Sequence, residues 1–126
     1  MKIGELAQRS GVSVRSLRYY EQQGLLAPIR HENGYREYTV FAPEQVKTIQ
    51  LYLSLGLTTA QIGHFLHCVL LNKEAFCTEV LPLYQSKLTE IDNQINQLQQ
   101  IKFNLEERIR SILEEQNLNN QEVIKE

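Results

Sequence analysis

The sequence predicts a mainly α-helical protein in which a compact front part is followed by one long helix. All six glycines and two of the three prolines lie before residue 64, and neither residue type occurs after Pro82. Behind Pro82, apolar residues recur at alternating steps of three and four, as in a helix with one apolar seam. With 126 residues, 42% of them hydrophobic, the chain has the composition of one ordinary globular unit.

Composition and charge exclude several classes of protein. No apolar run approaches the roughly eighteen residues of a membrane span, and the first residues lack the apolar segment of a secretory signal, so we expect a cytoplasmic protein without a membrane partner. The formal net charge is -2, yet residues 1–40 carry six Lys or Arg against four Glu, whereas residues 41–126 carry seven against eleven acidic residues. Any nucleic-acid surface must therefore be a local patch.

Residues 2–23 carry the pattern of two short helices joined by a tight turn. A small residue, Ala7, lets the helices cross closely, Gly11 permits the turn, and Leu17 seats the second helix in the core. Ser13 stands where that second helix needs an N-terminal cap. This spacing is typical of a helix-turn-helix.

The second helix of this pair has one face suited to the major groove of DNA. If Leu17 points inward, Tyr20 and Glu21 do so as well. The outward side chains are then Arg15, Arg18, Tyr19 and Gln22. Arginine can reach guanine edges or phosphates, and a tyrosine hydroxyl can bond a phosphate. The alternative is a solvated helix face with ordinary charges.

A short hairpin follows the helix pair. Asn33 and Gly34 lie between two β-prone runs, and both residues tolerate the positive φ of a tight turn. Tyr35 and Arg36 project from the returning strand, and Arg30 lies on the first strand. Such a hairpin resembles a wing that grips the DNA backbone, although it can also be a plain surface hairpin.

The pattern of residues 42–67 predicts a further pair of helices. Pro43 suits the first turn of a helix that Gly56 ends, and Thr58 with Gln61 forms a capping box for the next helix. Lys47 and Thr58 are candidates for added phosphate contacts, and a solvated surface explains them equally well.

The back of the chain predicts a coiled coil. Its apolar seam consists of Leu81, Tyr84, Leu88, Ile91, Ile95, Leu98, Leu105, Ile109 and Ile112, and only Lys102 breaks the register. A helix from Pro82 to Gln116 would be roughly 52 Å long, too long for the front part to bury. We therefore favour a dimer over a helix folded back on its own domain. The register alone permits a parallel or an antiparallel pair.

Several motifs together resemble the MerR transcription regulators. They are Ile3-Gly4-Glu5-Leu6-Ala7 with Gly11-Val12, Leu17-Arg18-Tyr19-Tyr20-Glu21 with Gly24-Leu25-Leu26, Asn33-Gly34-Tyr35-Arg36-Glu37-Tyr38, and Leu55-Gly56-Leu57-Thr58 with Ile62. The resemblance extends to about residue 116.

The resemblance implies a winged helix-turn-helix domain, a linker helix pair that forms a second wing, and long helices that pair antiparallel in a homodimer. It divides the chain into a DNA-binding domain at 1–75, a dimerisation helix at 76–116 and a polar tail at 117–126. In the family the positions of Arg18, Tyr19 and Arg36 contact DNA, and those of Tyr35 and Tyr38 build the wing. The predicted DNA-binding set is Arg15, Arg18, Tyr19, Arg30, Tyr35, Arg36 and Tyr38. Such regulators often distort a promoter spacer until RNA polymerase engages both promoter elements.

The cysteines bear on the signal that the protein senses. Cys68, Cys77 and His64 can be drawn as a three-ligand soft-metal site, and Cys77 matches one thiol ligand of mercury-responsive relatives. The remaining thiols of those relatives follow the long helix, and here no Cys or His occurs beyond Ile112. We therefore expect no metal and no cofactor, and two cysteines that need no disulfide in a reducing compartment.

Three classes of function remain. A dimeric regulator of transcription is favoured, and an excisionase-like architectural winged-helix protein is the alternative, although the long coiled coil is superfluous for that role. An enzyme lacks support, because the sequence shows no Gly-rich phosphate loop, nucleophile-base pair or complete metal triad. The inducing signal is not identified; a small molecule or a stress signal would act near residues 60–80.

Overall fold

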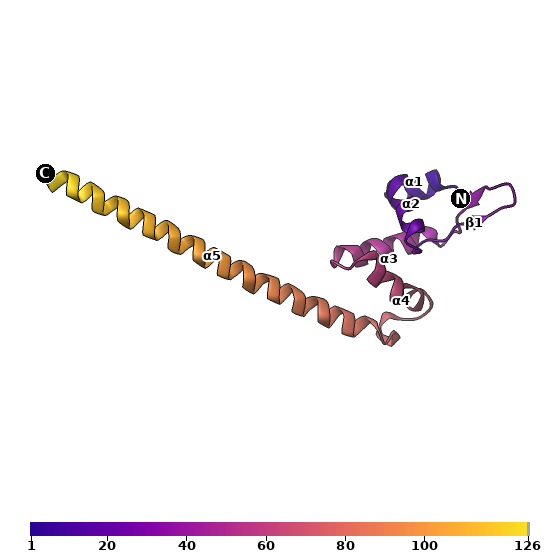
Figure 1. Cartoon of the computed structure of the whole chain (residues 1–126). Coiled ribbons are helices and arrows are strands. Elements are labelled where there is room, and N and C mark those ends of the chain that lie inside the picture. The colour runs from indigo at the N-terminus through magenta and orange to yellow at the C-terminus, as the bar shows by residue number, and fades with distance from the viewer. Residues whose placement is uncertain (126) are drawn as a thin grey trace. The chain divides into compact units, whose positions relative to one another are not determined.

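The computed structural model describes the backbone of residues 1–125 and the side chains of residues 1–120. Six elements, α1, α2, β1, β2, α3 and α4, are followed by a short 3-10 turn η1 and the long helix α5 (Figure 1). The chain divides into two compact units, Met1–Lys87 and the remainder from Leu88 onward, and each is described by itself.

The predicted helix-turn-helix is confirmed as α1 (Ile3–Ser10) and α2 (Val14–Gln22). Gly11 has a φ of 73° and its N–H donates to the Ala7 carbonyl at 2.9 Å, which closes α1. The Ser13 hydroxyl accepts a backbone N–H from the first turn of α2 at 3.1 Å. The turn and the cap therefore fix where α2 starts.

The predicted hairpin is confirmed as antiparallel strands β1 (Ile29–Arg30) and β2 (Arg36–Glu37). Its register places Ile29 opposite Glu37 and Arg30 opposite Arg36. Only Gly34, with a φ of 82°, is left-handed, so the positive φ allowed for Asn33 is not used. The reason is local, because the Asn33 side chain instead accepts the Tyr35 N–H at 3.0 Å.

The second helix pair is α3 (Ala42–Ser54) and α4 (Thr59–Leu71), and η1 (Glu74–Phe76) follows it. The predicted capping box is present: the Gln61 N–H donates to Thr58 Oγ1 at 3.1 Å, and the Thr58 N–H donates to Gln61 Oε1 at 2.9 Å.

One apolar core lies among these helices. α1 packs on α2 and α3, and α3 packs on α4. At the α3–α4 contact the rings of Tyr52 and Phe65 meet edge to face, with centroids 4.8 Å apart. The fully buried side chains include Leu6, Leu17, Leu25, Val46, Ile49, Tyr52, Ile62 and Phe65. The core thus connects the helix-turn-helix to the linker helices.

The long helix α5 (Val80–Lys125) differs from the prediction at both ends. Val80 is buried, Leu83 and Tyr84 pack against the core, and the first compact unit extends to Lys87. Residues 117–125, predicted as a polar tail, continue the helix, and no glycine or proline interrupts them. Within residues 1–125, no helix combines the length and apolar character that a bilayer crossing requires.

Gly11 offers a test of the helix-turn-helix. We expect Gly11→Ala to lower the free energy of unfolding by about 1 to 2 kcal/mol, because an L side chain is strained at its left-handed φ. A matched control is Gly4→Ala inside α1, where the added Cβ has open space and should stabilise by roughly 0.5 to 1 kcal/mol. Urea unfolding at fixed protein concentration measures both. Equal effects of the two substitutions would contradict the turn geometry.

Candidate nucleic-acid interface

The predicted inward and outward faces of α2 are confirmed. Leu17 and Tyr20 are buried, and Glu21 has a side chain that is only 10% exposed. The outward side chains Arg15, Arg18, Tyr19 and Gln22 are all exposed. α2 therefore presents two guanidinium groups and a phenol on one face.

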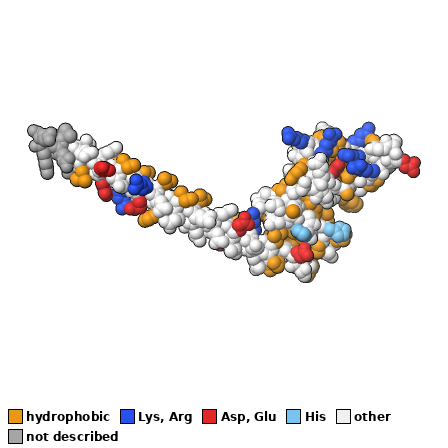
Figure 2. Space-filling view, in the orientation of Figure 1, with side chains coloured by type: hydrophobic (Ala, Val, Ile, Leu, Met, Phe, Trp, Pro, Cys, Tyr) orange, Lys and Arg blue, Asp and Glu red, His pale blue; other side chains and the backbone are white. Residues whose placement is uncertain are grey.

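Two hollows of about 570 Å³ flank this face. One lies between α2 and the hairpin and is lined by Arg18, Glu21, Gln22, Arg30 and Arg36. The other lies along α2 and is lined by Val14, Arg15, Arg18, Tyr19 and Gln22. In Figure 2, Lys and Arg side chains gather over the part of the chain that holds α1, α2 and the hairpin. The protein therefore has a local positive patch, although its net charge is negative.

An ion pair joins the hairpin to α2. Arg36 Nη1 donates to Glu21 Oε2 at 3.1 Å, although the two residues are fifteen positions apart in the sequence. The second carboxylate oxygen of Glu21 is buried without a hydrogen-bond partner. Sequence reasoning placed Glu21 inward and Arg36 on the hairpin but missed their pairing. An acidic side chain on the inward face of α2 was the available signal.

The prediction that Tyr38 contacts DNA is corrected. Its side chain is 3% exposed and its hydroxyl is buried, so the phenol cannot reach an external phosphate. Its backbone N–H donates to the Met1 carbonyl at 2.7 Å, and its ring belongs to the core. Tyr38 follows the last residue of β2 and therefore anchors the base of the hairpin in the core.

Tyr35, in contrast, is exposed at the hairpin and is held by two neighbours. The His31 ring stacks on it with centroids 5.6 Å apart, and Lys2 Nζ lies 5.2 Å from its ring centroid. His31 also bonds the Glu37 carboxylate at 2.8 Å. That hydrogen bond, together with the N-terminal ammonium 3.9 Å away, lowers the pKa of Glu37. These contacts, absent from the sequence prediction, hold the hairpin against the N-terminus.

The two further phosphate candidates already have partners within the chain. Lys47 Nζ pairs with the Glu44 carboxylate at 3.5 Å, and the Thr58 hydroxyl accepts the capping N–H of Gln61. Both residues remain exposed. The structure therefore assigns them local roles at the surface.

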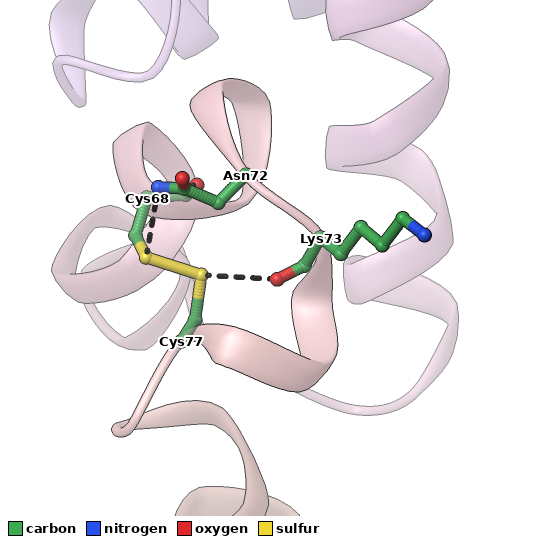
Figure 3. Close-up of a disulfide and its surroundings, with 4 residues drawn as sticks. All are labelled: Cys68, Asn72, Lys73 and Cys77. Atoms are coloured by element: carbon green, nitrogen blue, oxygen red, sulfur yellow. Dashed lines mark hydrogen bonds between the residues drawn. A yellow bond between two sulfur atoms is a disulfide. The ribbon is translucent and has the colours of Figure 1, made fainter.

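The expectation of unbridged cysteines is corrected as well. Cys68 and Cys77 form a disulfide, with Cα atoms 6.0 Å apart (Figure 3). The chain reverses between α4 and α5, which brings the two residues within the usual Cα separation for a disulfide. His64, the third residue of the candidate metal site considered from the sequence, lines the same small hollow as both cysteines. Within the part of the chain that the structure describes, no group of three or more His, Cys, Asp or Glu is arranged to hold a metal ion.

Comparisons with known proteins agree with this geometry. Residues 2–38 match the model of the MerR family regulatory protein. HTH-type transcriptional regulator HmrR of Rhizobium leguminosarum bv. viciae is 35% identical over 106 residues, which cover 84% of this chain and 81% of that protein.

Two solved structures are similar as well. The transcription regulator PbrR691 from Ralstonia metallidurans CH34, in complex with lead(II), has a TM-score of 0.74 and 26% identity over 83% of this chain and 82% of that one. HiNmlR, a MerR family regulator lacking the sensor domain and bound to promoter DNA, has a TM-score of 0.53 and 25% identity over 86% of each chain.

The contact between His31 and Glu37 predicts a pH effect. The lowered pKa of Glu37 means that the fold favours the ionised carboxylate, so this stabilisation is present above the unfolded pKa and is lost as the pH falls through the folded pKa. We expect His31→Ala to raise the pKa of Glu37 toward its ordinary value. Carboxyl ¹³C titration by NMR measures this shift. His67→Ala, on exposed α4 surface, is the control and should leave the titration of Glu37 unchanged.

Proposed function

Because the chain belongs to the MerR family of regulatory proteins, we propose that it is a homodimeric transcription regulator whose α2 enters the major groove of promoter DNA. The observation that carries this proposal is the continuous cationic surface of Arg15, Arg18, Arg30 and Arg36 across α2 and the hairpin. The proposed role is DNA binding rather than catalysis. A regulator of this kind would act in the cytoplasm, where its promoter lies.

The face of α2 supplies contacts of two kinds. Arg18 lines both hollows, so it lies at the centre of the surface and is the best placed side chain for a guanine edge. Arg15 and Tyr19 flank it and suit phosphates on either side of the groove. Base contacts give sequence preference, whereas phosphate contacts set the position of the helix.

The hairpin acts as the wing beside the groove. Arg30 and Tyr35 are exposed and suit backbone contacts. Arg36 has a second role, because its ion pair with Glu21 holds the wing against α2. A guanidinium has five N–H donors, so Arg36 can keep this bond and donate to a phosphate as well.

The exposed seam of α5 supports the homodimer. Leu88, Ile95, Leu98 and Leu105 are each about half exposed or more, and orange side chains run along α5 in Figure 2. A helix with such a stripe is stabilised when a second helix covers it. A second copy of this chain carries the same stripe, and an antiparallel pair would place two winged domains at opposite ends.

Two winged domains at a fixed separation favour control through DNA shape. A regulator bound to two half-sites can bend or untwist the DNA between them, and the cost depends on the spacer. We propose that this protein activates by distorting a spacer so that RNA polymerase engages both promoter elements, in response to an effector. HiNmlR, solved with promoter DNA, supports the DNA-binding part of this proposal.

The groove contact is tested with Arg18→Ala. We expect its promoter affinity to fall by about 1 to 3 kcal/mol, with relaxed preference at one base position, because a bidentate contact is lost. Arg9→Ala is the matched control, since Arg9 is exposed on α1, pairs with Glu5 at 2.9 Å and lines neither hollow. Binding by fluorescence anisotropy at several salt concentrations measures both. Unchanged affinity of the Arg18 variant would exclude the groove assignment.

The dimer is tested with Ile95→Asp. A buried carboxylate without a partner is strongly destabilising, so self-association should weaken about a hundredfold or more. The control Gln97→Asp adds the same charge off the seam and should retain the dimer. Sedimentation equilibrium measures the association constants. If both variants remain dimeric, α5 does not form the interface through this seam.

The distortion mechanism is tested at the promoter. Deleting two base pairs from the spacer should raise basal transcription and remove the need for the protein, because the shortened spacer already aligns the promoter elements. Run-off transcription with purified RNA polymerase measures the output, and the unaltered promoter is the control. Low transcription from the shortened spacer would identify an ordinary on-off repressor.

A further inference from the structure

We propose that Cys68 and Cys77 form a thiol–disulfide exchange site that is oxidised by low-molecular-weight disulfides and reduced by thiols. The state of this bond controls the junction between α4 and α5. The proposal rests on the proposed function for its effect on transcription and for the cytoplasmic location. A disulfide in a cytoplasmic protein is usually transient and redox-sensing, which fits a regulator better than a permanent structural bond.

The pair closes a short loop at the junction of two helices. Cys68 lies in the last turn of α4, and Cys77 lies three residues before α5 begins. The disulfide therefore ties the end of one helix to the start of the next over a separation of nine residues. When the bond is open, the backbone of residues 69–76 is the only covalent connection between the two cysteines.

Small thiols and disulfides can reach the sulfurs. A hollow of about 210 Å³ is lined by both cysteines together with His64 and Glu79. Cys68 is half-buried, whereas Cys77 is 4% exposed. Cys68 is therefore the sulfur that reacts with an external reagent, as the attacking thiolate during oxidation and as the attacked sulfur during reduction. Cys77 is the resolving partner.

Both redox states find polar partners without rearrangement. Asn72 Nδ2 lies 3.8 Å from Cys68 Sγ and can donate to it as a sulfide or as a thiolate (Figure 3). The Lys73 carbonyl oxygen lies 3.7 Å from Cys77 Sγ, a contact that becomes a hydrogen bond once that sulfur carries a proton. A buried Cys77 thiol is thus accommodated in the reduced form.

The loop between the cysteines also connects two helices through Glu74. Its carboxylate interacts with the phenols of Tyr52 on α3 and Tyr84 on α5, and the two phenols interact with each other. Burial, as the largest cause, and the Glu74 carboxylate raise the pKa of both phenols, so both phenols remain protonated. Closing the loop holds Glu74 in place and therefore couples α5 to the core of the DNA-binding unit.

The chemistry balances as a two-electron exchange. The Cys68 thiolate attacks one sulfur of a small disulfide, the external S–S bond breaks, and one external thiolate leaves. Cys77, deprotonated, then attacks the Cys68 sulfur and releases the second external thiolate. The released thiolates take up the two protons lost by the protein thiols. Excess small thiol drives the same steps in reverse.

The test uses the full-length protein equilibrated with oxidised or with reduced glutathione. Alkylation and mass spectrometry should find no alkylated cysteine in the first case and two in the second. Hydrogen exchange should be about tenfold slower or more for residues 72–87 of the oxidised protein, because the closed loop opens less often. Promoter output in run-off transcription should differ about fivefold or more between the two states, the lower end of usual coupling between sites.

Two variants separate the steps. Cys68→Ser combined with Cys77→Ser should give one exchange pattern and one transcription level under both conditions. Glu74→Gln should still form the disulfide but lose most of the difference at residues 80–87, because an amide is a weaker acceptor for the phenols.

Each failure has a distinct meaning. Two alkylated cysteines after equilibration with oxidised glutathione would overturn the exchange site. A disulfide that forms but leaves hydrogen exchange and transcription unchanged would overturn its control of the junction. If neither state binds promoter DNA, the proposed function fails, and alkylation with hydrogen exchange still decides the exchange site.

Discussion

Leu17 and Tyr20 attach α2 to the rest of the DNA-binding unit, and the candidate interface depends on that attachment. Their burial fixes the rotation of α2 about its own axis, because side chains one turn apart share a face. Once they point inward, Arg15, Arg18 and Tyr19 must point outward. The same rotation turns Glu21 toward the hairpin, where it meets Arg36.

The ion pair between Glu21 and Arg36 explains how so small a hairpin keeps a defined position. Each strand has two residues, which is too few for an independently stable ribbon. The hairpin is held instead by three sets of contacts. Arg36 pairs with Glu21 of α2, Tyr38 is buried in the core, and Tyr35 and Glu37 contact the N-terminal residues. A wing fixed at several points reaches DNA with little loss of conformational freedom on binding.

The junction before α5 connects the DNA-binding unit to the long helix. Glu74 interacts with a phenol from α3 and a phenol from α5, and the disulfide closes the loop that carries it. The exposed seam farther along α5 is the surface proposed for association, whereas the first two turns of α5 belong to the DNA-binding unit. A chemical change at the junction thus acts where the two roles meet.

Local sequence patterns were sufficient to predict the turn at Gly11, the caps at Ser13 and Thr58, the outward face of α2 and the apolar seam of α5. Backbone geometry and helical spacing act within a few residues, so a pattern is enough to reveal them. The burial of Tyr38, the ion pair of Glu21 with Arg36 and the bond between Cys68 and Cys77 could not be predicted from such patterns. Each of these depends on which distant segments meet, and side-chain packing, rather than spacing along the chain, settles that.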